Sequence, residues 1–125
     1  MNSERTGHVP AWPQELRLGE AGTRLAVRFE DGASYTLSAE FLRVESPSAE
    51  VKGHGPGQEV TVAGKRHVKI ARIEPVGNYA VRLVFSDGHS TGLYSWSYIE
   101  RLGREHDALW AAYLERLARE GKGRD

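Results

Sequence analysis

Alternation of hydrophobic and polar residues predicts a chain built mainly from β-hairpins. In residues 24–29, Leu25, Val27 and Phe29 share one face, which is the period-two pattern of a strand with one buried side. Asp31-Gly32 follows, a dipeptide that tolerates the positive backbone angle φ of a two-residue hairpin turn. The same alternation predicts further strands at residues 15–18, 34–37, 59–62, 68–73, 79–85 and 91–94.

Hydrophobic residues change to helical spacing near the C-terminus and predict a helix from about Glu105 to Glu120. The apolar stripe of this helix consists of Leu109, Trp110, Tyr113, Leu114 and Leu117. Shorter helices are expected at residues 38–43 and from a capping box of Ser97 with Glu100 to a stop at Gly103. The expected fold class is therefore α+β: an antiparallel, hairpin-based sheet, open to folding into two layers, with a short helix and a longer C-terminal helix.

Glycine and proline divide the chain into segments. Residues 45–58 contain five of them and are predicted to form a loop, not a helix or strand. We expect a flexible N-terminal arm at residues 1–13, a single domain at residues 14–120 and a tail at residues 121–125. One core is expected, because a chain of 125 residues folds without needing disulfides or metal.

Two segments of the chain repeat one plan: strand, Asp-Gly turn, strand, short helix. The first runs from Phe29 to Arg43 and the second from Phe85 to Arg101. In this comparison His89 falls where the first copy has Ala33. The turn itself therefore does not require a histidine, which makes His89 a candidate functional residue.

Composition excludes several classes of function. The chain has no cysteine, so it has no disulfides, no thiolate nucleophile and no cysteine-ligated metal. Lys plus Arg and Asp plus Glu both number 17, so the basic excess that phosphate contacts require is missing and we expect no nucleic-acid partner. No apolar run approaches the roughly 20 residues of a membrane span, and the N-terminus has no apolar signal region. We expect a cytoplasmic protein with no membrane partner.

Sequence motifs of known enzymes are missing as well. There is no Gly-x-Ser-x-Gly elbow, no Walker loop and no His-Glu-x-x-His pair, and no histidine begins the His-x-Asp or His-x-Glu pair of iron oxygenases. We therefore expect no enzyme activity and no catalytic residues. His67 and His106 are expected in solvent. His54 and His89 stay open as metal ligands, beside the interpretation that each is a hydrogen-bonded structural residue.

Three motifs in order carry a family resemblance. They are residues 42–57, with Ser46-Pro47-Ser48 and Gly53-His54-Gly55-Pro56-Gly57; residues 73–79, with Pro75-Val76-Gly77-Asn78-Tyr79; and Asp87-Gly88-His89-x-x-Gly92-x-Tyr94-Ser95-Trp96. Over residues 14–117 the chain resembles the gamma-butyrobetaine hydroxylase-like N-terminal domain family, as a stand-alone bacterial member. In the full-length hydroxylases this domain precedes a separate catalytic jelly-roll that holds iron and 2-oxoglutarate. That catalytic domain has no counterpart in these residues.

The resemblance also implies a comparison with the zinc site of the hydroxylase domain, which uses three cysteines and a later histidine. The cysteine positions fall on Ser46, Ser48 and Val51, and the histidine position falls on His89. Zinc prefers thiolate, imidazole and carboxylate ligands, so we expect no zinc site of the family type. His89 is expected to form hydrogen bonds toward the Ser46–Ser48 loop, or to join His54 in a different site.

Two hypotheses for the function follow. The leading one is a non-catalytic protein-interaction or scaffold domain, with no cofactor. Its expected contact surface consists of Ser46, Ser48, His54, Asp87, His89, Tyr94 and Trp96. The alternative is a metal-binding accessory protein of iron or iron–sulfur metabolism, in which His89, His54 and either Asp87 or Glu50 hold iron or zinc.

The resemblance suggests a class of partner. The same domain occurs fused to nucleotide-binding proteins of iron–sulfur cluster assembly, so assembly factors are candidate partners by analogy of fold. The partner protein is otherwise unidentified, and a homodimer is left open.

Overall fold

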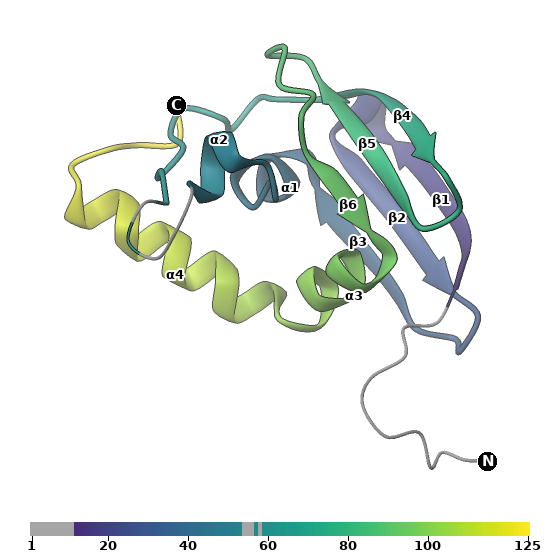
Figure 1. The fold of residues 1–125 in the computed structure, drawn as a ribbon. Coiled ribbons are helices and arrows are strands. Elements are labelled where there is room, and N and C mark those ends of the chain that lie inside the picture. The colour runs from purple at the N-terminus through teal and green to yellow at the C-terminus, as the bar shows by residue number, and fades with distance from the viewer. Residues whose placement is uncertain (1–11, 54–56, 58) are drawn as a thin grey trace.

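The computed structural model describes residues 12–53, 57 and 59–125 (Figure 1). Two three-stranded antiparallel sheets, ordered β1-β2-β3 and β4-β5-β6, make up its β structure. Their strands are β1 (Pro13–Gly19), β2 (Arg24–Phe29), β3 (Ser34–Ser38), β4 (Ile70–Val76), β5 (Ala80–Phe85) and β6 (Leu93–Ser95). The helices are a 3-10 turn η1 (Glu20–Gly22) and α1 (Ala39–Val44), α2 (Ala49–Lys52), α3 (Trp96–Arg104) and α4 (His106–Arg119). The predicted α+β class is confirmed.

The two sheets share one hydrophobic core. Leu25, Val27 and Phe29 of β2 are at most 2% exposed, on the face that the alternation predicted. They belong to one buried cluster with Leu83 and Phe85 of β5. Because the central strand of each sheet turns its apolar side inward, the sheets form two layers that overlap in Figure 1.

Helix α4 lies beside the sheets and forms a second, smaller core with the end of α1 (Figure 1). Tyr113 and Leu117 of its predicted stripe are buried against Val44. The hydroxyl of Tyr113 donates a hydrogen bond to the carbonyl of Val62 at 2.6 Å. The stripe is not buried throughout, since Leu114 is 39% exposed.

The segment predicted to be a loop contains one turn of helix. The Ser48 hydroxyl oxygen accepts the backbone N–H of Glu50 at 3.1 Å and caps α2, which has four residues. The sequence did not predict this turn, because the glycines and prolines around it indicated a loop. The strand predicted at residues 59–62 was wrong as well, because Val60 donates its N–H to the carbonyl of Val51 at 2.7 Å and so pairs with α2. His54 lies outside the described residues.

Helix α3 starts earlier and ends later than predicted. Its N-cap is Ser95, whose hydroxyl accepts the N–H of Tyr98 at 3.1 Å, whereas the sequence suggested Ser97. Gly103 does not stop the helix but lies inside it. A Cβ at Gly103 would lie 2.4 Å from the ring of Tyr35, so the glycine allows β3 and α3 to pack closely.

The C-terminal residues of the chain differ from the prediction. Residues 121–125, predicted as a tail, pack against the domain: the guanidinium of Arg124 holds both carboxylate oxygens of Glu40, at 2.7 and 2.8 Å. Of the predicted N-terminal arm, residues 1–11 lie outside the described residues, and Pro13 already belongs to β1. In the described ranges no helix is both long enough and apolar enough to cross a bilayer.

Candidate functional site

The two Asp-Gly hairpins share their atomic design. In the first, Asp31 Oδ1 accepts the backbone N–H of Ala33 at 3.0 Å; in the second, Asp87 Oδ1 accepts that of His89 at 3.1 Å. The glycine of each pair has a φ of 92°, a left-handed value that favours glycine. The equivalence of Ala33 and His89 is therefore confirmed, and the histidine side chain is an addition to a turn that forms without it.

His89 is buried between two polar partners. Its side chain is 3% exposed. Its Nε2 lies 2.8 Å from Ser46 Oγ, and its Nδ1 lies 3.1 Å from Glu50 Oε1. A carboxylate only accepts hydrogen bonds, so we assign the proton to Nδ1, and Nε2 then accepts from the Ser46 hydroxyl. Ser46 Oγ in turn accepts the N–H of Ser48 at 3.2 Å. The contact of Ser46 with Nε2 confirms the predicted hydrogen bond between His89 and this loop.

Electrostatics favour the neutral form of this histidine. Burial lowers the pKa of His89, and the positive charge of Arg43 lowers it further. The carboxylates of Glu50 and Asp87 oppose both effects without reversing them. A neutral imidazole at neutral pH agrees with one donating and one accepting nitrogen.

Asp87 connects three parts of the chain. Its Oδ2 lies 2.8 Å from Arg43 Nε on α1 and 2.6 Å from Lys65 Nζ in the segment before β4. Burial opposes ionisation, but hydrogen bonds from Lys65, from the N–H of His89 and from Arg43 lower the pKa of Asp87 to about 2. The Nη1 atom of Arg43 is buried and has no hydrogen-bond partner in the part of the chain that the structure describes.

Ser46, His89 and Glu50 form a line of nucleophile, base and carboxylate that is also found in serine hydrolases. Sequence motifs gave no sign of it. In a working triad the serine oxygen must be reachable by a carbonyl carbon, yet Ser46 is 0% exposed. A Cβ at Gly92 would lie 2.5 Å from Ser46 Oγ, so the backbone fills the space beside that oxygen. The arrangement is a closed hydrogen-bonded cluster in this conformation.

The residues at the zinc positions of the family do not fit zinc. Val51 offers only methyl groups and is 3% exposed. The Ser48 hydroxyl is hydrogen-bonded to Thr91 Oγ1 at 2.7 Å, and Ser46 and His89 hold each other. Within the described ranges, no three or more His, Cys, Asp or Glu side chains gather as a metal would require.

Several residues predicted for a contact surface lie inside the domain. Ser46, Ser48, His89 and Tyr94 are buried, and the Tyr94 hydroxyl donates to the carbonyl of Leu42 at 2.5 Å. Trp96 is partly buried, and its indole N–H donates to the Asn78 carbonyl. A role for these side chains in binding a partner stays a prediction. In this conformation they join the loop to the second hairpin.

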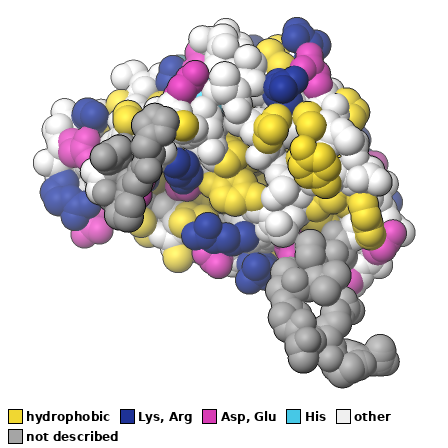
Figure 2. All heavy atoms as spheres, viewed as in Figure 1, with side chains coloured by type: hydrophobic (Ala, Val, Ile, Leu, Met, Phe, Trp, Pro, Cys, Tyr) yellow, Lys and Arg dark blue, Asp and Glu magenta, His cyan; other side chains and the backbone are white. Residues whose placement is uncertain are grey.

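An open groove lies next to this cluster, between the residues that follow α1 and the helices α3 and α4. Its volume is about 300 Å³. It is lined by Val44, Glu45, Val51, Lys52, Glu59, Val60, Tyr98, Arg101, Leu102, Leu109 and Arg116. Figure 2 shows hydrophobic side chains in the hollow between α2, α3 and α4, flanked by Lys or Arg side chains. Sequence reasoning missed this groove.

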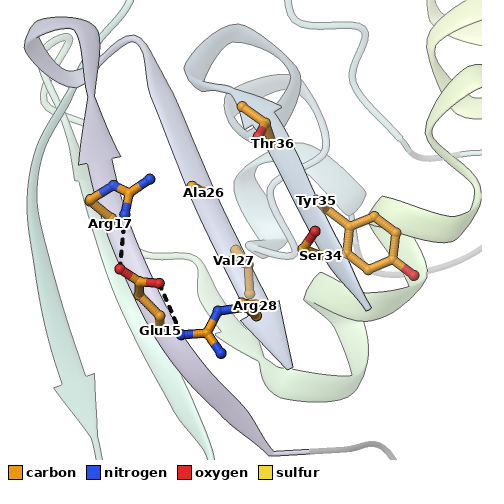
Figure 3. A pocket seen from close by; sticks show the side chains of 8 residues that line it. All are labelled: Glu15, Arg17, Ala26, Val27, Arg28, Ser34, Tyr35 and Thr36. Atoms are coloured by element: carbon orange, nitrogen blue, oxygen red, sulfur yellow. Dashed lines mark hydrogen bonds and ion pairs between the residues drawn. The ribbon is translucent and has the colours of Figure 1, made fainter. Parts of the chain in front are cut away.

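A second hollow of about 280 Å³ lies on the outer face of the first sheet (Figure 3). Glu15 is placed between two arginines there, 2.9 Å from Arg17 and 3.3 Å from Arg28. The side chains of all three are at least 40% exposed, and such surface pairs contribute little. We interpret this hollow as the polar outer face of the sheet.

Comparison with known proteins identifies the family. Residues 16–100 match the family described as gamma-butyrobetaine hydroxylase-like, N-terminal. The chain belongs to this family. The resemblance seen in the sequence motifs is therefore confirmed. No curated protein matches the chain.

Solved structures agree with this assignment to the gamma-butyrobetaine hydroxylase-like N-terminal family. Two NMR solution structures are each 46% identical to the chain and cover 94% of it, with TM-scores of 0.81 and 0.78; the matches span 92% and 91% of those proteins. A crystal structure of a DUF971 family protein of unknown function, from Acidithiobacillus ferrooxidans, is 41% identical, with a TM-score of 0.60. That match covers 73% of this chain and 91% of the other.

Proposed function

We propose that this family member is a non-catalytic protein-interaction domain and that its contact surface is the groove between α2 and the α3–α4 pair. The observation that supports this proposal is a concave surface with apolar side chains that are partly open to solvent. Val60 is 52% exposed, and Tyr98 and Leu109 are half-buried, while Val51 and Leu102 beneath them are buried. Concave apolar surfaces with a few polar groups at the rim are typical of binding sites.

The non-catalytic part of the proposal depends on the closed cluster around Ser46. For hydrolysis the serine would have to leave the backbone of Gly92 and exchange its hydrogen bonds for a substrate carbonyl. An oxyanion hole needs free N–H donors beside the reacting oxygen, whereas the N–H of Ser48 already donates to Ser46 Oγ itself. The test is an esterase assay of the unmodified protein and of Ser46→Ala. An activity that the unmodified protein has and the folded variant lacks would contradict this proposal.

The alternative is a metal-binding accessory protein of iron or iron–sulfur metabolism. It requires His89 to release Ser46 or Glu50 and to join His54 at one metal. A direct test is the metal content of untagged protein purified without chelator, beside that of His89→Ala. Stoichiometric iron or zinc that disappears in the variant would favour the accessory protein over the interaction domain.

The location and partner class belong to the same proposal. We propose a cytoplasmic protein, since a chain without cysteine suits a reducing compartment. Proteins of iron–sulfur cluster assembly are the partner class that the family resemblance suggests. Self-association is the competing outcome and can be measured by sedimentation.

Site-specific photo-crosslinking in cells tests the proposed surface. A crosslinking amino acid at Val60 is expected to give a defined adduct with a partner, and Arg116→Glu should weaken that adduct. The matched control is the same amino acid at Thr36, on the outer face of the first sheet, which is expected to give no such adduct. Equal labelling at both positions would place the contact surface elsewhere.

A further inference from the structure

We infer that the groove binds a short acidic segment of a partner protein that presents one or two aliphatic side chains. This inference rests on the proposed interaction function and names the chemistry of the partner. It follows from the apolar floor, the size of the groove and the charges at its rim.

The floor selects an aliphatic ligand. Val44, Val51 and Leu102 are each at most 3% exposed, so they form the packed base beneath the groove and leave almost no surface for a ligand to cover. The apolar surface that a ligand can cover comes from the half-buried Tyr98 of α3 and Leu109 of α4 and from Val60, which is 52% exposed. The Tyr98 hydroxyl already donates to the Glu45 carbonyl at 2.5 Å, so the groove is left with the aromatic ring and not a free polar group. Burying an aliphatic side chain there removes apolar surface from water and so favours binding.

The size of the groove limits the ligand to a few residues. A volume of about 300 Å³ lies at the lower end of the range for ligand pockets. One or two aliphatic side chains fill such a space, whereas a long amphipathic helix needs an extended groove. The occupant is therefore a short linear segment.

The rim selects negative charge. Its three cations are Lys52, Arg101 and Arg116, and its two carboxylates are Glu45 and Glu59. Glu45 is 5% exposed and is already neutralised by Lys52, whose Nζ lies 3.2 Å away. The carboxylate of Glu59 accepts the neutral N–H of Gly57 at 3.1 Å and keeps its charge, so three cations and two carboxylates leave the rim with a net charge of +1.

Two arginines remain for a ligand carboxylate. The guanidinium of Arg116 lies over the ring of Tyr113, 5.8 Å from its centre, and has no ion-pair partner among the described residues. Arg101 pairs with Glu105 at 3.1 Å, but both side chains are more than 40% exposed. Such an exposed pair contributes little, so a ligand carboxylate can compete for Arg101. Arginine also forms two parallel hydrogen bonds to one carboxylate, which favours an acidic residue beside the aliphatic one.

Defined peptides test this inference on the intact chain. The probe is the blocked hexapeptide Glu-Leu-Asp-Leu-Leu-Glu, followed by backbone NMR shifts of the protein at about 50 mM salt. One control peptide replaces the leucines by serine, and a second replaces the acidic residues by lysine. We expect the probe to shift the signals of Val60, Arg101, Leu102 and Arg116, and both control peptides to bind at least tenfold more weakly.

Variants assign the contribution of each cation. Arg116→Glu and Arg101→Glu should each weaken probe binding about threefold to tenfold, the range that a lost and reversed charge contact gives. Arg119→Glu is the matched control, because Arg119 lies on α4 outside the groove. It should leave binding within twofold.

Three results would overturn the inference. The first is the lack of saturable shifts at the groove with the hexapeptide. The second is equal binding of the lysine peptide, which would remove the acidic requirement. The third is binding of hexanoate with the same shifts and affinity as the peptide, which would make the ligand a small carboxylate. If the peptide fails while crosslinking at Val60 still captures a partner, the interaction function stands and only the acidic–aliphatic chemistry is wrong.

Discussion

The backbone of Gly92 lies against the hydroxyl of Ser46 so closely that a Cβ added at residue 92 would be 2.5 Å from Ser46 Oγ. Real Cβ atoms do not approach an oxygen so closely, and the serine cannot move away without breaking its hydrogen bonds to His89 and Ser48. The fit between these two residues keeps the loop and the second hairpin together.

We predict that Gly92→Ala lowers the free energy of unfolding by about 1–3 kcal/mol, the usual cost of overpacking. Ser46→Ala alone should cost about 1 kcal/mol through its lost hydrogen bonds. The double variant should lose less than the sum, because the added methyl group then meets no hydroxyl. Urea unfolding measures all three. Gly19→Ala is the control, since nothing lies within 4 Å of a Cβ there; strict additivity would contradict the contact.

Acid stability should depend on Asp87. Its pKa falls from 3.8 to about 2 in the folded state, so its contribution is complete above about pH 4 and is lost as the pH falls through 2. The side chain is 20% exposed, so after screening we expect about 1–2 kcal/mol. Asp87→Asn should remove this part of the acid dependence in urea unfolding between pH 5 and 2. Asp31→Asn, at the matching turn position, should leave this acid dependence unchanged. Equal effects of both variants would contradict the prediction.

His89 should titrate below the ordinary value of 6.5, because burial and Arg43 lower its pKa. Stability from the neutral ring is therefore present above about pH 6.5 and is lost as the pH falls through the folded-state pKa. NMR of the imidazole nitrogens measures the midpoint and shows whether Nδ1 carries the proton. Glu50→Gln should lower the midpoint further, since that carboxylate raises it. A His89 midpoint at or above 6.5 would be inconsistent with the structure.

The ion pair of Arg124 with Glu40 should be worth more than surface pairs. The carboxylate of Glu40 is 7% exposed and loses both hydrogen bonds in Arg124→Gln, which we expect to cost about 2–3 kcal/mol. Arg66→Gln breaks the exposed pair with Asp125 and should cost less than about 1 kcal/mol. Adding Glu40→Gln to Arg124→Gln should recover part of the loss in thermal unfolding, because no charge is then left buried.

Sequence predicted those parts of the fold that local rules determine. The Asp-Gly turns and the strands beside them follow from a period of two and from a glycine at positive φ, so the match of Asp31 with Asp87 follows from the amino-acid pattern alone. The interior face of β2 was predicted for the same reason, since alternation alone decides which side chains turn inward.

Contacts between distant segments could not be predicted in this way. Gly103 looks like a helix stop until the ring of Tyr35 is placed against it, and that ring comes from the other sheet. Residues 59–62 alternate like a strand, but Val60 donates its N–H to the carbonyl of Val51 in α2. The pairing of His89 with Ser46 was expected from the family resemblance. The groove could not be predicted, because its walls come from four segments whose relative positions the sequence does not give. The sequence therefore indicated the loop at residues 45–58 but not the groove beside it.

The long separations along the chain between Asp87, His89 and their partners predict the order in which parts of the domain fold. Arg43 and Asp87 are 44 positions apart, and Ser46 and His89 are 43 apart, whereas each hairpin closes within a few residues. Closing the long loops costs more chain entropy, so the two hairpins can form early and these contacts must come late. The contacts of the second hairpin with Arg43 and Ser46 thus act as a latch that closes after the hairpins exist, and mutations that remove these contacts should speed unfolding more than they slow folding.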